Sequence, residues 1–314
     1  MRTFLRMKER WVHMAGEAIT AGNELPEEME FNLSDFALFL TVMKNKDAYE
    51  SMLSIIMDDP DLKLKEVKVE EVVLNRVGKR AIRLDAWAMD MENRQYATEM
   101  QNDTSKDDVR KRSRFYQGLL DSPVLKSGKK TRYRQLPSSV IIFITQEDIF
   151  AKDLAAYTFS EQCEEIKGLH LEDGTTKIFL NMSSKNGRPD LISLLQYMKR
   201  TYLDNPEILV RDSRIMKLAE IVEEVKQSEE WETVKMSILS VGLERGTEIG
   251  KEIGRTEGKA DSVLILLEKF APIPDELRIQ IRNQMDMSVL NSWLVKAANA
   301  KSLDDFVEAM ENDR

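Results

Sequence analysis

Asp85 and Glu99 are the two residues around which the chemistry of this chain can be organised. They lie in residues 79–101, where two runs of alternating apolar and polar residues flank a polar centre, a pattern that predicts a β-hairpin. If the connecting loop has an odd number of residues, for instance residues 91–93, Asp85 lies directly opposite Glu99. Opposed side chains are about 4.5–5.5 Å apart at Cβ, and like charges there destabilise the strand pair.

Two carboxylates in that relation require a cation, and hard oxygen ligands suit Mg²⁺, with Mn²⁺ or Ca²⁺ as possible substitutes. The same odd loop sets Asp90 opposite Arg94. An even loop sends Asp85 and Glu99 to opposite faces of the hairpin. A separate alternative is a half-exposed hairpin whose acids merely face water.

Three short motifs carry a resemblance to a known family. They are Arg83-Leu84-Asp85, Glu99-Met100-Gln101 and residues 112–117 (RSRFYQ). In this order they resemble the recombination-promoting nuclease and putative transposase family, a branch of the PD-(D/E)XK nuclease superfamily. The superfamily carries an acid at the end of one strand and E-x-K on the next, whereas this branch has E-x-Q, as the chain does. The resemblance covers roughly residues 31–185 and, more loosely, the tail.

The resemblance implies a fold and a reaction. The fold is α/β, with a PD-(D/E)XK restriction-endonuclease-like core in which helices flank a mixed sheet, here followed by a long C-terminal helix and a small all-α tail. The order of elements is helix, three strands, helix, strand. The activity is that of a magnesium-dependent DNA endonuclease of low sequence specificity that acts on double-stranded DNA, linked to recombination or transposition.

The resemblance also assigns roles to residues. Asp85 and Glu99 hold the metal, with the main-chain carbonyl of Met100 as a further ligand. Gln101 replaces the lysine of other members and, because glutamine carries no charge, it orients the water or the scissile phosphate. Asp35, at the start of the first helix, is either a third metal-side carboxylate or only an acid that complements the helix dipole.

Two other functions remain open. One is a DNA-binding or partner-binding module with an inactive nuclease fold. The other is a transposase that joins strands, because the same metal site serves hydrolysis and strand transfer.

A basic segment follows the acid pair. Residues 105–135 contain ten Lys or Arg against three Asp, a net charge of +7 in a chain of net charge −9. This asymmetry indicates a local contact with a polyanion, although a solvated basic helix has the same composition. Arg110 and Arg114 share a helix face, and with Tyr116 and Gln117 they are the residues expected to hold the DNA phosphate.

Composition excludes several other functions. Cys163 is the only cysteine of the 314 residues, and His13 and His170 are the only histidines. Disulfide frameworks within the chain are excluded, and little room is left for histidine-bound zinc or a Ser-His-Asp triad. The longest apolar runs fall far below the about 20 residues that span a bilayer, so we expect a cytoplasmic protein without a membrane segment.

The remaining pattern predicts these elements: a helix from Ser34, as N-cap, to about Met57; strands at residues 67–77, 139–145, 157–162 and 177–183; and a helix at residues 190–203. The expected domains are a helical segment (1–30), the nuclease domain (31–205), a long helix (206–260) and a tail of four short helices (261–314).

The long helix contains a glycine at every fourth position from Gly242 to Gly258. Each glycine costs roughly 0.8–1.0 kcal/mol relative to alanine inside a helix. We therefore expect either a close partner helix from a second copy, which makes a homodimer, or a flexible connector.

Overall fold

The computed structural model describes residues 30–73, 82–105, 107–125 and 132–311, without the side chains of residues 242–246, 248 and 249. The chain divides into two compact units. Among the described residues, one unit comprises those up to Lys235, and the other comprises those from Met236 onward. The expected helix at residues 1–30 and the end of the strand expected at 67–77 lie outside the described residues.

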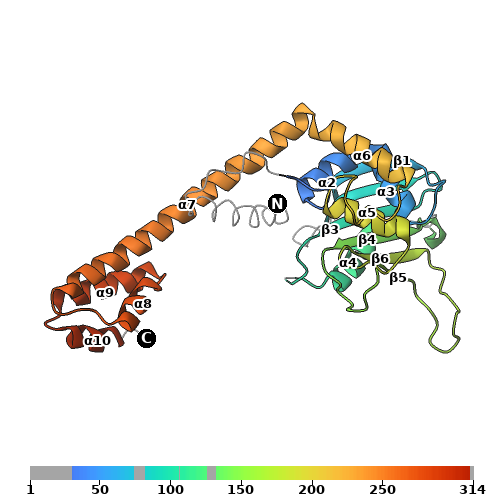
Figure 1. Cartoon of the computed structure of the whole chain (residues 1–314). Helices are drawn as coiled ribbons and strands as arrows, with labels where there is room; N and C mark the ends of the chain where they lie inside the picture. The colour runs from blue at the N-terminus through green and yellow to red at the C-terminus, as the bar shows by residue number, and fades with distance from the viewer. Residues whose placement is uncertain (1–29, 74–81, 106, 126–131, 312–314) are drawn as a thin grey trace. The chain divides into compact units, whose positions relative to one another are not determined.

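A six-stranded sheet forms the centre of the first unit, in the order β1-β2-β3-β4-β6-β5 (Figure 1). The strands are β1 (Leu64–Val73), β2 (Ile82–Asp90), β3 (Gln95–Gln101), β4 (Ser139–Thr145), β5 (Ala156–Phe159) and β6 (Thr175–Asn181). β3, β4 and β6 run parallel, and the other neighbouring pairs are antiparallel. The predicted mixed sheet flanked by helices is confirmed.

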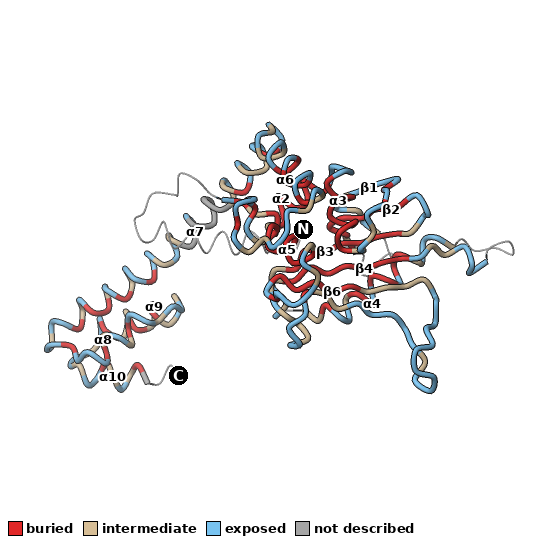
Figure 2. Tube along the Cα trace, turned by 45° about the vertical axis from the view of Figure 1, so that its right-hand side comes forward, coloured by how far each residue is buried: buried red, intermediate tan, exposed pale blue. Residues whose placement is uncertain are grey.

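β4 is the central strand, as its unbroken apolar run predicts. All seven of its residues are buried, and buried residues continue into β3 (Figure 2). A strand in this position is covered on both faces, so it has no polar alternation.

Helices cover the two faces of the sheet. They are α2 (Phe36–Met43), α3 (Lys46–Ile56), α4 (Val109–Asp121) and α5 (Pro189–Lys199). Tyr49 of α3 donates a hydrogen bond to Thr98, whereas Arg112 of α4 donates to Glu99. Because neighbouring residues of a strand point to opposite faces, α3 and α4 lie on opposite sides of β3.

The first helical region differs from its prediction. The expected single helix from Ser34 to Met57 is two helices, because Asn45 begins a new one by accepting hydrogen bonds from the backbone N–H groups of Asp47 and Ala48. The N-cap of α2 is Asp35 and not Ser34. The predicted strand at 157–162 is also shorter, since β5 ends at Phe159.

The long helix is likewise divided. α6 (Ser213–Lys226) ends before α7 (Glu229–Glu268) begins, and its apolar face, with Ile215, Leu218 and Val222, is buried in the first unit. The first unit extends to Lys235, beyond the predicted domain boundary at residue 206. Ser228 explains the break, because its hydroxyl accepts a hydrogen bond from the backbone N–H of Trp231 in the first turn of α7.

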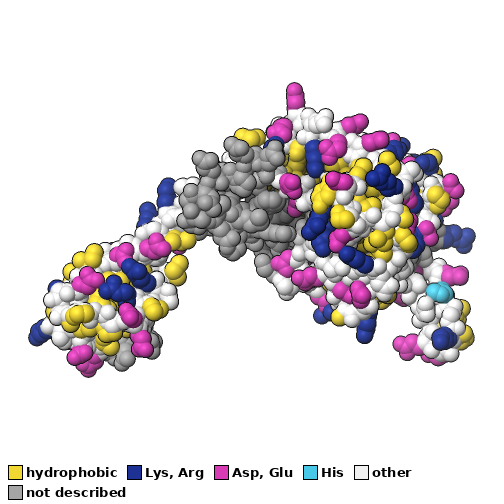
Figure 3. Space-filling model, in the orientation of Figure 1, with side chains coloured by type: hydrophobic (Ala, Val, Ile, Leu, Met, Phe, Trp, Pro, Cys, Tyr) yellow, Lys and Arg dark blue, Asp and Glu magenta, His cyan; other side chains and the backbone are white. Residues whose placement is uncertain are grey.

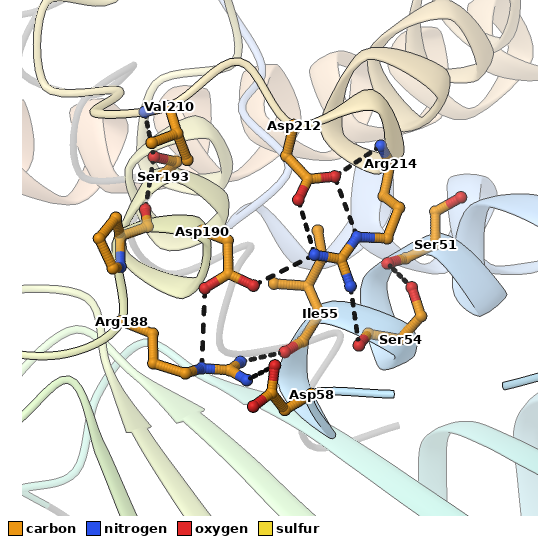
Figure 4. Close-up of polar contacts among 11 residues, drawn as sticks. Ser51, Ser54, Ile55, Asp58, Arg188, Asp190, Ser193, Val210, Asp212 and Arg214 are labelled. Carbon is orange, nitrogen blue, oxygen red and sulfur yellow. Dashed lines mark hydrogen bonds and ion pairs between the residues drawn. The ribbon is translucent and has the colours of Figure 1, made fainter. Parts of the chain in front are cut away.

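A network of two arginines and three aspartates fastens α6 to α3 and α5 (Figure 4). Arg214 Nη1 donates to the carbonyl of Ser54 at 3.1 Å, and its Nη2 lies 2.6 Å from Asp212 and 3.1 Å from Asp190. Arg188 pairs with Asp58 and donates to the carbonyl of Ile55. Both guanidinium groups thus satisfy carbonyls at the C-terminal end of α3, where a helix favours positive charge.

The second unit has its own apolar core. α8 (Asp275–Arg282), α9 (Met287–Asn299) and α10 (Leu303–Glu311) pack with the end of α7, and Leu264, Leu267, Leu290, Trp293 and Phe306 are buried between them. Three of the four predicted short helices are present. The first, expected near residue 261, is the continuation of α7.

Candidate active site

The loop of the central hairpin fixes the register on which the site depends. The Asp90 N–H donates to the Arg94 carbonyl at 3.0 Å, and the side chain of Asp90 accepts from the N–H groups of Glu92 and Arg94. Asn93 has φ 63°, a left-handed conformation that asparagine tolerates. The loop therefore has three residues, the odd number on which the prediction depended.

This register brings the two predicted acids together. Ala86 pairs with Thr98, so the next residues along the strands, Asp85 and Glu99, face each other. The Asp85 N–H donates to Glu99 Oε1 at 3.0 Å, and the Met100 N–H donates to Asp85 Oδ2 at 3.0 Å. Each carboxylate thus binds the backbone of the opposite strand. Asp85 is 3% exposed and Glu99 0% exposed.

Burial sets the electrostatics of this pair. Loss of solvent, followed by the charge of Glu99, raises the pKa of Asp85 well above its ordinary value. Burial also raises the pKa of Glu99, although the nearby Arg112 opposes the rise. Two buried carboxylates beside one guanidinium leave an excess of negative charge, which favours a proton or a cation.

Arg112 is the cation nearest to the acid pair. α4 begins at the N-cap Asp108, whose side chain accepts from the N–H groups of Arg110 and Lys111, and its inner face carries Arg112 one turn before Tyr116. Arg112 Nη2 donates to Glu99 Oε2 at 2.6 Å, and Nη1 donates to Gln101 Oε1 at 2.6 Å. Arg112 therefore links the second acid to the third predicted site residue.

Gln101 lies two residues after Glu99 on the same face of β3. It is buried, accepts from Arg112, and donates through Nε2 to the carbonyl of Asp103. Both ends of its amide are therefore held within the protein.

The residues expected to hold phosphate separate into two groups. Arg110 and Arg114 are exposed on the outer face of α4, and Lys111 is exposed beside them. Tyr116 and Gln117 are buried on the inner face, where Tyr116 accepts from Arg112 and Gln117 donates to Ser139 and Asp121. The structure therefore does not place the two pairs on one surface.

Asp35 does not join the acid pair. Its neighbour Ser34 accepts a hydrogen bond from Asn102 at 2.9 Å, so the start of α2 lies near the end of β3. The Asp35 carboxylate, however, accepts from the Asn32 N–H at 2.8 Å. Across the parts of the chain that the structure describes, no three Asp, Glu, His or Cys side chains form a group that could hold a metal ion.

Arg112 is the residue to which sequence reasoning gave no role in the site, since it was noted only as the first residue of the RSRFYQ motif and as one of ten basic residues. Helical spacing could have found it. Val109, Tyr116 and Leu120 are apolar and lie at helical intervals on one face, and Arg112 falls on that face, whereas Arg110 and Arg114 do not.

Asp85 and Glu99 are the acidic residues that would hold a divalent cation of the magnesium type. Asp85 Oδ2 accepts the Met100 N–H, while Oδ1 accepts no hydrogen bond from the described residues. Mg²⁺ in proteins is commonly held by one or two carboxylates, with water and substrate phosphates as its other ligands. Asp85 and Glu99 would supply two such carboxylates, with Glu99 Oε1 already accepting from the Asp85 N–H and Oε2 from Arg112.

Comparison with known proteins gives no relative for this chain. No family model, no curated protein and no solved structure matches it. The structure also has, within its described residues, no helix that combines the length and the apolar character needed to cross a membrane.

Proposed function

We propose that the protein is a divalent-metal-dependent DNA endonuclease. The observation that carries this proposal is the buried pair of Asp85 and Glu99, which face each other across β2 and β3 with Arg112 beside them. Burying two like charges is costly unless they serve a cation. The E-x-Q motif after the first acid, by its resemblance to the recombination-promoting nucleases, supports DNA as the substrate.

Asp85 and Glu99 are the residues that would hold the metal. A bound Mg²⁺ would lower the pKa of a water molecule and neutralise charge that develops on the phosphate. The protein contributes the rigid frame: each carboxylate is fixed by a backbone N–H of the opposite strand, so its position does not depend on substrate.

The outer face of α4 would bind the DNA backbone. Arg110 and Arg114 lie one turn apart and exposed, and α4 begins close after the end of β3, so this basic face starts near the acid pair. On the face of the first unit shown in Figure 3, basic and acidic side chains are intermixed. A local basic row suits contacts with phosphates, which carry no sequence information, and so favours low specificity.

Cleavage of supercoiled plasmid DNA tests this function. We expect nicking that requires Mg²⁺ or Mn²⁺, stops with chelator, and falls by orders of magnitude in Asp85→Asn and Glu99→Gln. Glu92→Gln is the matched control, because Glu92 lies in the loop of the same hairpin with its side chain 80% exposed. Wild-type rates in either acid variant would end the proposal.

A further inference from the structure

The third site residue, Gln101, carries no charge, yet a cation reaches its side chain. Arg112 approaches from α4 and places Nη1 2.6 Å from Gln101 Oε1. A neutral amide oxygen accepts from a guanidinium without adding charge to the site. Gln101 on β3 and Arg112 on α4 therefore act as one unit.

The guanidinium of Arg112 is fixed in place on several sides. Nε and Nη2 donate to the Tyr116 hydroxyl at 2.9 and 2.7 Å, and Nη2 also donates to Glu99. Its central carbon lies 5.1 Å from the ring centre of Tyr116 and 5.4 Å from that of Phe143. A planar cation with this support has little freedom to lose when it binds a ligand.

One donor of Arg112 remains for a substrate. A guanidinium has five N–H groups, and the hydrogen bonds of Arg112 engage Nε, both protons of Nη2 and one proton of Nη1. The second Nη1 proton has no acceptor among the described residues. The side chain of Arg112 is 15% exposed, so part of it reaches solvent.

We propose that Arg112 supplies, from helix α4, the positive charge that the neutral Gln101 cannot give to the scissile phosphate, and that Gln101 and Tyr116 position its guanidinium beside Glu99. This inference rests on the proposed nuclease function. Arg112 differs in this role from Arg110 and Arg114, which are exposed on the outer face and would contact phosphates away from the cut.

The arrangement makes a specific prediction about charge. A lysine at position 101 would place a second cation against Arg112, so Gln101→Lys alone is unfavourable. Arg112→Gln alone removes the charge, although its amide can still donate to Glu99. The double variant Gln101→Lys/Arg112→Gln restores one cation and one amide with their places exchanged.

Plasmid cleavage by the full chain tests this exchange. We expect Arg112→Gln to lower the rate about 10²–10³-fold, as for the loss of one donor to a developing anion. Gln101→Lys should also cleave slowly, and the double variant should exceed both single variants at least about tenfold, a size of coupling expected for residues in contact. Arg114→Gln is the matched control, and its effect should combine additively with Gln101→Lys.

Binding of a labelled DNA duplex in chelator gives a second readout that needs no cleavage. Loss of a phosphate contact lowers the slope of log K against log salt concentration by about one unit. We expect this change for Arg112→Gln, and a smaller one for Arg112→Lys, which keeps the charge and loses the fork. Circular dichroism and thermal unfolding identify any variant that fails to fold, and Arg112→Lys then replaces Arg112→Gln in both measurements.

The outcomes separate the two proposals. A wild-type protein that cleaves, with Arg112 variants that match it in rate and salt slope or with no recovery in the double variant, overturns the role of Arg112. A wild-type protein that fails to cleave DNA in the presence of every divalent metal tested overturns the nuclease function. If the wild-type protein does not cleave but the salt dependence of DNA binding still changes in the Arg112 variants, the phosphate contact of Arg112 stands without the nuclease function. An unchanged salt dependence in the same case overturns both proposals.

Discussion

Arg112 Nη2 lies 2.6 Å from Oε2 of Glu99, a carboxylate with no exposed surface. The pair joins the first turn of α4 to β3, so the helix that carries the outer basic row is fixed to the strand that carries the acid. Stability and the proposed chemistry therefore depend on the same contact.

Removing Arg112 should destabilise the protein because Glu99 then has no cation. We expect Arg112→Ala to lower the free energy of unfolding by about 3–5 kcal/mol, the usual cost of breaking a buried ion pair. Adding Glu99→Gln to the Arg112→Ala variant should recover a large part of this lost stability, since the unpaired buried charge of Glu99 is then removed. Urea unfolding of the four proteins in this cycle measures the coupling, and additive effects would contradict the contact.

Neutralising Asp85 should have the opposite effect. In chelator, Asp85→Asn should raise the free energy of unfolding by roughly 0.5–1 kcal/mol, because a like-charge contact across the strands is lost. The folded-state pKa of Asp85 is raised, so ionisation costs stability as the pH rises through that pKa. The stability gained in Asp85→Asn should be greatest above the folded-state pKa of Asp85. It should vanish below about pH 3.8, the ordinary pKa of an aspartate. Thermal unfolding from pH 4 to 8, with Glu92→Gln as control, checks both sign and trend.

The anchor of α6 should respond to acid. Arg214→Ala should lower the free energy of unfolding by roughly 1–3 kcal/mol, since it breaks hydrogen bonds to charged groups. The hydrogen bond from Arg214 lowers the pKa of Asp212 below 3.8, so this stability is present above that pH and lost as the pH falls through the folded-state pKa. The difference in the free energy of unfolding between Arg214→Ala and the wild-type protein should therefore become smaller below about pH 4. Arg211→Ala, an exposed neighbour, should show no such dependence.

The glycines of α7 offer a separate test. A Cβ added at Gly250, Gly254 or Gly258 would meet nothing within 4 Å. Alanine at all three should therefore stabilise α7 by about 0.8–1.0 kcal/mol per position, which thermal unfolding of the full chain measures. Sedimentation of the same variant examines the predicted homodimer, because a second helix packed on the glycines would be displaced by the added methyl groups. We expect the alanine variant to be more stable and to sediment as the wild-type chain does. Weaker self-association of the variant would contradict this expectation and favour a homodimer packed on the glycines.

Much of the site follows from the sequence, because alternation on two strands and a three-residue loop determine which side chains face each other. The sequence alone could not decide between an odd and an even loop. The structure decides it through the hydrogen bonds of Asp90 and the conformation of Asn93.

Most of the expectations that proved wrong concern helix ends. Asn45 and Ser228 each begin a helix within a stretch whose apolar spacing continues across the break. A side-chain cap is a local signal that periodicity averages away. The inward direction of Arg112 was missed for a related reason, since charge counting over residues 105–135 ignores the face on which each charge lies.

Calorimetric titration with Mg²⁺ and Mn²⁺ tests most directly whether Asp85 and Glu99 share a cation. We predict binding of the metal to the wild-type chain and to Glu92→Gln, and loss of that binding in both Asp85→Asn and Glu99→Gln, because either change removes one of the two charged ligands. Equal heats for all four proteins would contradict a metal site at the acid pair and, with it, the proposed function.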